Sequence, residues 1–235
     1  MNQTRPPDTT CQYWLGRDVF CAEVVDGVIF LDLKRNRYLG LPAEHALKLR
    51  GLPRRGPIVP VDPAPIAALV ESNLFSCTPQ PETDSFAPPV ATGAIRKIDL
   101  FRARERLSAV SGARFAAAYI RSHAPYRTRS LKSAVTHLRR RKVTKIPSIE
   151  AGEQELIDLS VQFMKFRALT YSARNRCLLD CLVLADFLQS HRVSCTFVLG
   201  VASRPFRAHC WIQSAGLVLN DTYENVSSFS PLLSV

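Results

Sequence analysis

Three residues in the last third of the chain have the types that a thiol nucleophile requires: Cys177, His209 and Asp221. Cys177 opens a predicted apolar helix, for which Asn175 or Ser172 is the expected N-cap. The ordinary pKa of a thiol, about 8.5, is too high for a thiolate at neutral pH, so the thiol needs a helix dipole and a nearby imidazole. His209 would be that base, and Asp221 would orient its ring. The three residues predict a thiol-dependent hydrolase or acyltransferase.

The spacing of His209 and Asp221 can be tested by counting which residues lie opposite each other in a hairpin. A three-residue loop over 214–216 places the two residues directly opposite each other, about 4.5–5.5 Å apart, whereas a two-residue loop turns Asp221 to the other face. Gly216 stands where a three-residue loop needs a left-handed residue. We therefore expect a three-residue loop that pairs base and orienting acid.

A zinc site is an alternative use of the same region, which is rich in cysteine and histidine. Zinc sites favour short Cys-x2–4-Cys knuckles joined by tight turns, whereas Cys177 and Cys181 lie four apart in a predicted helix. Cys210 is expected to point away from His209 because successive strand residues alternate. We expect no metal, and zinc bound to the purified protein would contradict this.

The elements that must position these residues form an α+β pattern, with helices followed by an antiparallel sheet. The apolar spacing predicts helices over 98–122, 126–141, 153–168 and 175–191, and then strands over 194–201, 206–213 and 217–221.

A second, smaller domain is predicted at the N-terminus. Alternating residues predict strands over 19–25, 28–33 and 38–41, with Asp26-Gly27 as a hairpin turn. Helices are expected over 42–49 and 63–73. Residues 77–94 contain a stretch rich in Pro, Ser and Thr that reads as a linker. The expected division is 1–76, 77–94 and 95–235.

Composition and cysteine number indicate the protein class. The chain is 46% hydrophobic and 22% charged, as in globular proteins. Residues 1–10 lack the apolar core of a signal peptide, and no apolar run reaches the roughly 18–20 residues of a membrane span. Seven cysteines without regular spacing do not suggest a disulfide framework. We expect a cytoplasmic protein.

The positive charge is concentrated in one segment. Residues 90–145 hold 15 Lys and Arg against 2 Asp and Glu, a net charge of +13 within a chain of +11. A nucleic-acid binder would need more aromatic residues for base stacking than Phe101, Phe115, Tyr119 and Tyr126. An acidic protein partner and a simple solvated helix face both remain open.

The chain resembles the leader peptidase of lasso-peptide biosynthesis, the B protein of the microcin J25 type. The resemblance lies in 176–178, 197–201, 205–211 and 218–221 and in the separations between Cys177, His209 and Asp221. The family often has alanine where this chain has Cys210. Residues 18–41 resemble the RiPP recognition element, a small winged-helix domain similar to the pyrroloquinoline quinone chaperone.

The resemblance implies that the N-terminal domain captures the leader of a ribosomally made precursor as an added strand. The expected contacts are Leu33, Arg35, Arg37, Tyr38, Leu39, Ile66, Leu69 and Val70. The C-terminal domain would then cut off the leader. A separate lasso cyclase, an asparagine-synthetase-like C protein, would use ATP to close the ring. This chain has no phosphate loop, so no cofactor of its own is expected.

Two other functions use the same residues and stay open. A transglutaminase-like acyltransferase would employ the same triad with an amine as acceptor. A non-catalytic peptide-binding scaffold would retain the triad only as a relic of the fold.

Overall fold

A computed structural model describes residues 12–50, 57–60, 63–79, 91–94, 107–143 and 151–235. The chain divides into two compact units. The N-terminal unit comprises Met1–Phe86 with Val201–Arg207, and the C-terminal unit comprises Ala87–Gly200 with Ala208–Val235. The boundary between Phe86 and Ala87 falls inside the predicted 77–94 linker, and the separate segment Val201–Arg207 groups with the N-terminal residues.

The N-terminal unit contains the predicted three-stranded antiparallel sheet. Its strands are β2 (Val19–Val24), β3 (Gly27–Asp32) and β4 (Arg37–Pro42), in the order β2-β3-β4. Gly27 begins β3 at a φ of 150°, and a Cβ there would lie 2.0 Å from the Leu41 carbonyl oxygen. The hairpin therefore requires glycine at this position.

Two helices and two short strand pairs accompany this sheet in the described residues of the N-terminal unit. They are α1 (Ala43–Ala46), α2 (Pro63–Glu71), β1 (Trp14–Leu15) with β7 (Phe75–Ser76), and β5 (Leu49–Arg50) with β6 (Val59–Pro60). The helix predicted over 42–49 ends at Ala46, so its last turn is wrong. Leu49 is buried and pairs with Pro60 in the β5–β6 ladder, so sheet pairing replaces helix there.

Apolar side chains from the sheet and α2 form the core of the N-terminal unit. Phe30, Ile58, Ile66 and Leu74 have no exposed surface. The rings of Phe30 and Phe75 meet edge to face with centroids 5.8 Å apart. The predicted helix over 63–73 is thus present as α2 because its apolar face covers the sheet.

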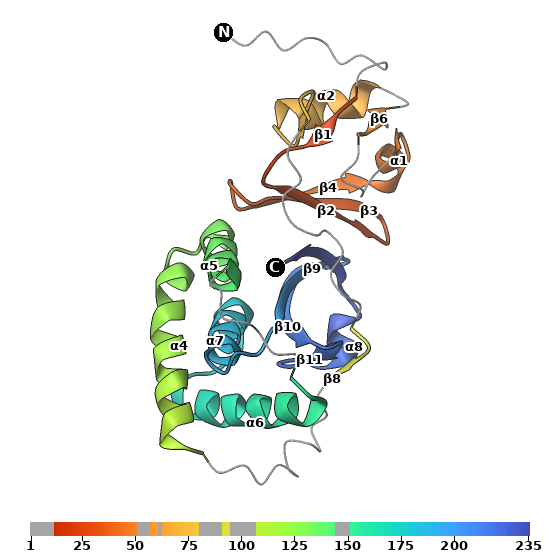
Figure 1. Ribbon diagram of the computed structural model, residues 1–235. Helices are drawn as coiled ribbons and strands as arrows, with labels where there is room; N and C mark the ends of the chain where they lie inside the picture. Colours follow the sequence, from red (N-terminus) through yellow and green to blue (C-terminus); the bar gives the residue numbers. More distant parts are fainter. Residues whose placement is uncertain (1–11, 51–56, 61–62, 80–90, 95–106, 144–150) are drawn as a thin grey trace. The chain divides into compact units, whose positions relative to one another are not determined.

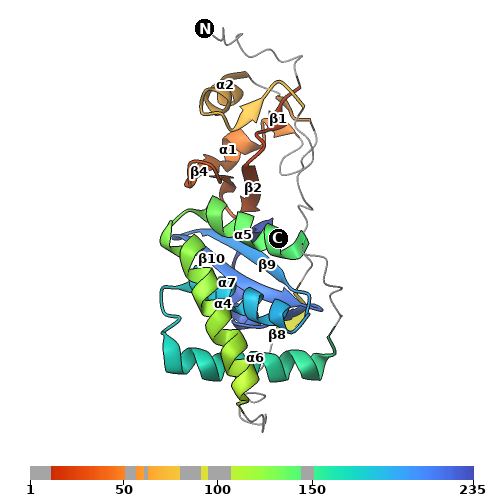
Figure 2. The same ribbon diagram turned by 60° about the vertical axis from the view of Figure 1, so that its left-hand side comes forward.

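Four long helices dominate the C-terminal unit: α4 (Ala109–Arg127), α5 (Leu131–Val143), α6 (Glu153–Thr170) and α7 (Cys177–Ser190). Figures 1 and 2 show α7 between α4 and the strands of the sheet, and α7 contacts α4, α5 and α6. Within the described part of the chain, no helix is both long and apolar enough to span a membrane.

The first two predicted helices have different bounds in the structure: α4 ends at Arg127 instead of 122, and α5 covers Leu131–Val143 instead of 126–141. The Ser108 side chain caps α4, which begins at Ala109, and the predicted helical residues 98–106 lie outside the described residues. The predicted end at 122 is too early, because α4 continues through Pro125 to Arg127. Proline disturbs a helix mainly within the turn around it, and here only two further helical residues follow it.

A five-stranded sheet in the order β12-β9-β10-β11-β8 holds the other half of the C-terminal unit. Its strands are β8 (Gly93–Ala94), β9 (Thr196–Ser203), β10 (Phe206–Ser214), β11 (Leu217–Val218) and β12 (Ser230–Ser234), and α8 (Tyr223–Val226) lies between the last two. β8 runs parallel to β11. Residues 93 and 94 of the predicted 77–94 linker therefore belong to the sheet. Helices and strands are mixed, as the α+β prediction requires.

Aromatic packing and a buried carboxylate hold α7 in place. The rings of Phe115, Phe163 and Phe187 join α4, α6 and α7 with centroid distances of 5.7, 6.1 and 6.4 Å. Asp186 of α7 is 1% exposed, and its carboxylate pairs with His137 at 3.1 Å and with Nε of Arg141 at 3.1 Å. Part of the basic charge of α5 therefore serves an internal contact.

Candidate active site

Cys177 is the first residue of α7 and is partly exposed. The N-cap is Arg176, which makes no side-chain capping bond, so the prediction of Asn175 or Ser172 as cap is wrong. Asn175 instead takes a positive φ of 59°, and the Ser172 hydroxyl accepts the Arg174 N–H at 3.3 Å. The polar residues before the helix thus shape the turn that leads into it. Cys177 still lies at the positive end of the helix dipole, which favours a thiolate.

His209 on β10 contacts both other members of the predicted triad. Its Nε2 is hydrogen-bonded to Oδ2 of Asp221, and it also makes a side-chain hydrogen bond with Cys177. The rings of Phe229 and Trp211 lie 5.3 and 6.3 Å from the imidazole and shield it from solvent. The structure therefore brings Cys177, His209 and Asp221 together in the order that acid–base assistance to a thiol requires.

The hairpin that carries this pair has a different loop from the predicted one. Gln213 pairs with Val218, so the loop is the two residues Ala215 and Gly216 rather than 214–216. Ala215 has a φ of 47° and Gly216 one of 80°. Two positive φ angles define the tight two-residue turn. The prediction failed because alanine gives no sequence signal for the left-handed conformation.

Asp221 reaches His209 although this register would turn it to the opposite face. The ladder continues only as far as the hydrogen bond from the Leu219 N–H to the Ile212 carbonyl, at 2.9 Å. After Asn220 the chain turns into α8, and Asp221 lies at that turn. The predicted pair is present, but it forms where the strand ends and not by cross-strand pairing.

Hydrogen bonds keep Asp221 ionised. Burial acts to raise its pKa, but the bond from His209 and those from the Thr222 N–H at 2.7 Å and the Asn225 amide at 2.8 Å outweigh burial and lower it. An ionised Asp221 in turn favours the charged imidazole.

The pKa values of Cys177 and His209 move in opposite directions. A hydrogen bond from the Cys210 thiol contributes most to lowering the pKa of Cys177, burial opposes it, and the bond from His209 lowers it further, to about 4. The bond to Asp221 contributes most to raising the pKa of His209, the bond to Cys177 adds to it, and burial opposes it, giving about 9. Near neutral pH the two residues form a thiolate–imidazolium pair.

Cys210 belongs to the site, although the sequence predicts that it points away from His209. It is 2% exposed, and its thiol makes hydrogen bonds with both Cys177 and Cys181. Those two bonds, together with burial, raise the pKa of Cys210 well above its ordinary value, so its thiol stays protonated and can donate. Alternation along β10 says which face a side chain leaves from, but the position of the α7 N-terminus decides which side chains reach Cys177.

The cysteine-rich region does not present a metal site in the described residues, where no group of three or more His, Cys, Asp or Glu side chains is arranged around a common point. The Cys210 thiol instead makes hydrogen bonds with the thiols of Cys177 and Cys181.

The eight residues expected to bind a peptide fall into two groups. Ile66 and Leu69 are buried in the core of the N-terminal unit, Leu39 and Val70 pack against that core, and Leu33 is buried just after β3. These side chains are spaced at helix and strand periods because they face inward, and the sequence pattern alone does not separate a core face from a binding groove.

The remaining three residues lie at the surface of the N-terminal unit. Arg35 pairs with Asp32 at 3.0 Å and donates to the Ser72 carbonyl at 3.0 Å, which ties the β3–β4 turn to the end of α2. Arg37 is exposed at the start of β4. The Tyr38 ring lies 5.2 Å from that of Phe206.

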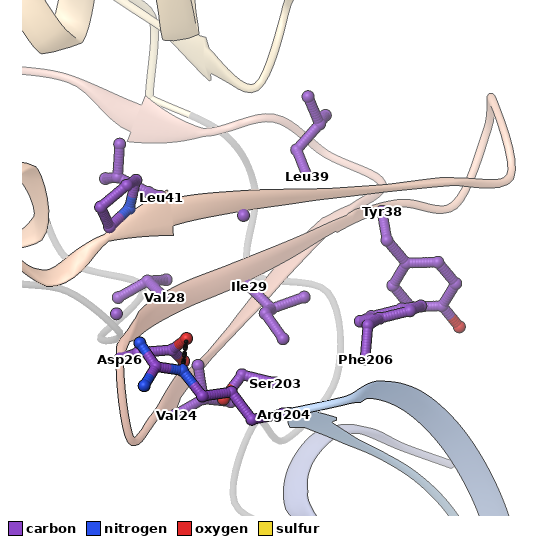
Figure 3. A pocket seen from close by; sticks show the side chains of 13 residues that line it. Val24, Asp26, Val28, Ile29, Tyr38, Leu39, Leu41, Ser203, Arg204 and Phe206 are labelled. Carbon is purple, nitrogen blue, oxygen red and sulfur yellow. Dashed lines mark hydrogen bonds and ion pairs between the residues drawn. The ribbon is translucent and has the colours of Figure 1, made fainter.

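A groove of about 550 Å³ in the N-terminal unit runs along β3 and β4. Figure 3 shows Tyr38 and Phe206 facing each other at one end and Arg204 bound to Asp26 at the other, at 2.9 Å. Ile29 lies between these ends on the same face of the sheet as Tyr38, whereas the Leu39 side chain points to the other face. The groove thus combines apolar walls with one ion pair.

Substitution of Asp221 by asparagine should separate the two titrations. In the wild type, alkylation of Cys177 by iodoacetamide should rise through about pH 4 and change again near pH 9, where the imidazolium loses its proton. Asp221→Asn removes the anion that raises the pKa of His209, so the upper step should move to lower pH. Mass spectrometry of the Cys177 peptide measures both steps. Reactivity that rises only near the ordinary thiol pKa of about 8.5 would show that no ion pair forms.

Cys210→Ala should raise the pKa of Cys177, because it removes the donor with the largest effect on that thiol. The lower step of the alkylation profile should therefore move to higher pH, and Cys210→Ser, which keeps a hydroxyl donor, should restore part of the shift. Cys181→Ala is the matched control, since it removes a buried thiol of the same helix whose hydrogen bonds go to Cys210 and Asn220 and not to Cys177. Equal shifts in the alanine variants at 181 and 210 would contradict a specific role for Cys210.

A comparison with protein families agrees with this geometry. The model of the transglutaminase-like superfamily matches residues 113–234, a stretch that includes most of α4, all of α5, α6 and α7, and all three residues of the site. Searches of curated proteins and of solved structures found no match. The matched stretch covers more than half of the chain and has a fold that serves cysteine proteases and acyltransferases. The chain belongs to the transglutaminase-like superfamily.

Proposed function

We propose that this protein is a cysteine peptidase that removes the leader from a ribosomally synthesised precursor during lasso-peptide maturation. The observation that carries the enzymatic part is the contact of His209 with both Cys177 and Asp221. The choice of substrate is supported by the resemblance of 176–178 and 205–211 to lasso leader peptidases.

Acylation begins with the Cys177 thiolate. Its sulfur attacks the carbonyl carbon of the scissile peptide bond and forms a tetrahedral intermediate. The His209 imidazolium gives its proton to the departing amine of the core peptide, and the C–N bond breaks. The leader is then held as a thioester on Cys177, and His209 is neutral.

Deacylation uses the same pair in reverse. Neutral His209 takes a proton from water, the hydroxide attacks the thioester carbonyl, and the C–S bond breaks. The leader leaves with a free carboxylate, and the thiolate–imidazolium pair is restored. Asp221 keeps the ring oriented and stabilises its charge in both steps.

The start of α7 supplies donors for the oxyanion. The first backbone N–H groups of a helix have no intrahelical acceptor, and that of Cys177 is the first in α7. A carbonyl oxygen that becomes negative next to Cys177 would receive this N–H and the positive end of the helix dipole.

Leader capture is assigned to β4, which forms one edge of the three-stranded sheet of the N-terminal unit. An extended peptide can add to such an edge through its backbone, while side-chain pockets select its sequence. The groove beside β4 offers Tyr38 and Ile29 for this purpose, while Leu39 packs against the core on the other face of the sheet. Arg37 and Arg35 flank the strand with positive charge. Ile66, Leu69 and Val70 support the sheet from the core side, and Leu33 is buried where β3 ends.

The freed amine of the core peptide would pass to the ATP-using cyclase, and we assign all nucleotide chemistry to that partner. Exposed arginines of α4 and α5, such as Arg127 and Arg140, are the candidates for an acidic face of the cyclase or of the precursor. Arg141 is a poor choice because it already pairs with the buried Asp186.

Incubation of the protein with its precursor peptide tests the reaction. The wild type should release a leader with a free carboxylate and a core peptide with a free amine, and Cys177→Ala should release neither. His209→Ala should slow release by about 10²–10⁴-fold, because general acid–base assistance is lost. Mass spectrometry identifies the products. A leader joined to an added amine would indicate acyl transfer, and processing by Cys177→Ala would indicate a scaffold function.

Tyr38→Ala should weaken leader binding by about tenfold, as expected for a central aromatic contact. Fluorescence anisotropy of a labelled leader peptide measures the affinity. Cleavage of a short peptide that spans only the cut site should be unchanged. Glu23→Ala is the matched control, since Glu23 is exposed on β2, the opposite edge strand. An equal loss of affinity in both variants would contradict binding at β4.

A further inference from the structure

Asn220 immediately precedes Asp221, and its side chain joins the sheet to α7. Its Oδ1 accepts the backbone N–H of Ile212 on β10 at 2.9 Å. Its Nδ2 donates to Oδ2 of Asp180 at 3.1 Å and lies 3.5 Å from Sγ of Cys181. One amide group thus contacts the strand that carries His209 and the helix that begins with Cys177.

The contact with Ile212 replaces a backbone bond. In a regular antiparallel ladder, two directly paired residues exchange both of their N–H···O bonds. Leu219 donates to the Ile212 carbonyl at 2.9 Å, but the return bond from the Ile212 N–H goes to Asn220 Oδ1. The side chain satisfies β10 in place of the backbone, so the backbone is released from the ladder at this point and can turn.

The other end of Asn220 is anchored on a fixed carboxylate. Asp180 is 3% exposed and lies one turn after Cys177 on α7. Its oxygens also accept from Nη1 of Arg167 at 3.2 Å and from the Tyr171 hydroxyl at 3.1 Å. A buried carboxylate with three donors has little freedom to move, so it fixes Asn220 relative to the start of α7.

We propose that Asn220 is a positioning residue: held on Asp180, it sets where the chain leaves the sheet and so places Asp221 against His209. The regular register would turn Asp221 away from His209, and the substitution of a backbone bond by the Asn220 side chain is what allows the turn. This role rests on the proposed catalytic use of His209 and Asp221, although its first readout needs no substrate.

Three variants separate the two functions of the Asn220 amide. Asn220→Ala removes both the acceptor for Ile212 and the donor to Asp180. Asn220→Asp keeps the acceptor but sets a carboxylate against Asp180. The double variant Asn220→Asp with Asp180→Asn restores a donor–acceptor pair with the direction reversed, so recovery in it reports the direct contact.

The pH profile of Cys177 alkylation is the decisive measurement. In Asn220→Ala and Asn220→Asp the upper step should move to lower pH, as in Asp221→Asn, because His209 loses its oriented partner. The double variant should move back toward the wild type. With precursor, kcat should fall about 10²-fold in Asn220→Ala at a similar KM, the loss expected of a displaced catalytic group.

Ser214→Ala is the matched control, since it removes a hydrogen bond of the same hairpin, to the Ser194 carbonyl at 2.6 Å, away from Asp221. It should leave the upper step in place. A wild-type profile in folded Asn220→Ala and Asn220→Asp would overturn the proposal, as would a double variant no better than Asn220→Asp. A shifted profile without precursor cleavage would uphold the positioning role and reject the proposed substrate.

Discussion

The ion pair between the Cys177 thiolate and the His209 imidazolium requires the C-terminal unit to hold α7 and β10 in a fixed relative position. Each charge stabilises the ionised form of the other residue, whereas burial alone would favour the neutral thiol and the neutral imidazole. Such a pair needs its two elements held at fixed separation. The aromatic packing of α4, α6 and α7 fixes the helix, while Asp221 and the ring of Phe229 fix the imidazole.

Buried carboxylates link the site to the helices around it. Asp180 lies in the first turn of α7, and Asp186 lies six residues further along the same helix. Asp180 accepts a hydrogen bond from Arg167 of α6, and Asp186 accepts one from Arg141 of α5. A buried charge is tolerated only when donors surround it, so these two residues determine how α5 and α6 dock. The basic character of residues 90–145 therefore has two parts. Arg141 supports the fold, whereas Arg127 and Arg140 are exposed.

Long elements were predictable and their ends were not. Apolar periodicity over 63–73, 153–168 and 175–191 predicts α2, α6 and α7 because each buries a continuous face. The failures lie where a tertiary contact overrides the local signal. Leu49 leaves a predicted helix to pair with Pro60, and α4 passes Pro125 because its other residues pack on α7. Of the expected peptide contacts, Ile66 and Leu69 are core residues, because apolar spacing alone does not distinguish a core face from a binding face.

The sequence by itself determined the chemistry of the site: the residue types of Cys177, His209 and Asp221, and their place on a helix start and a hairpin. Only the tertiary structure decided how they meet. The two-residue loop turns Asp221 the wrong way, and the Asn220 side chain, anchored on Asp180, releases the chain so that it returns to His209. Cys210 likewise became a donor to Cys177. Residue spacing along one strand cannot predict these contacts of Asn220 and Cys210, because they depend on where α7 lies against the sheet.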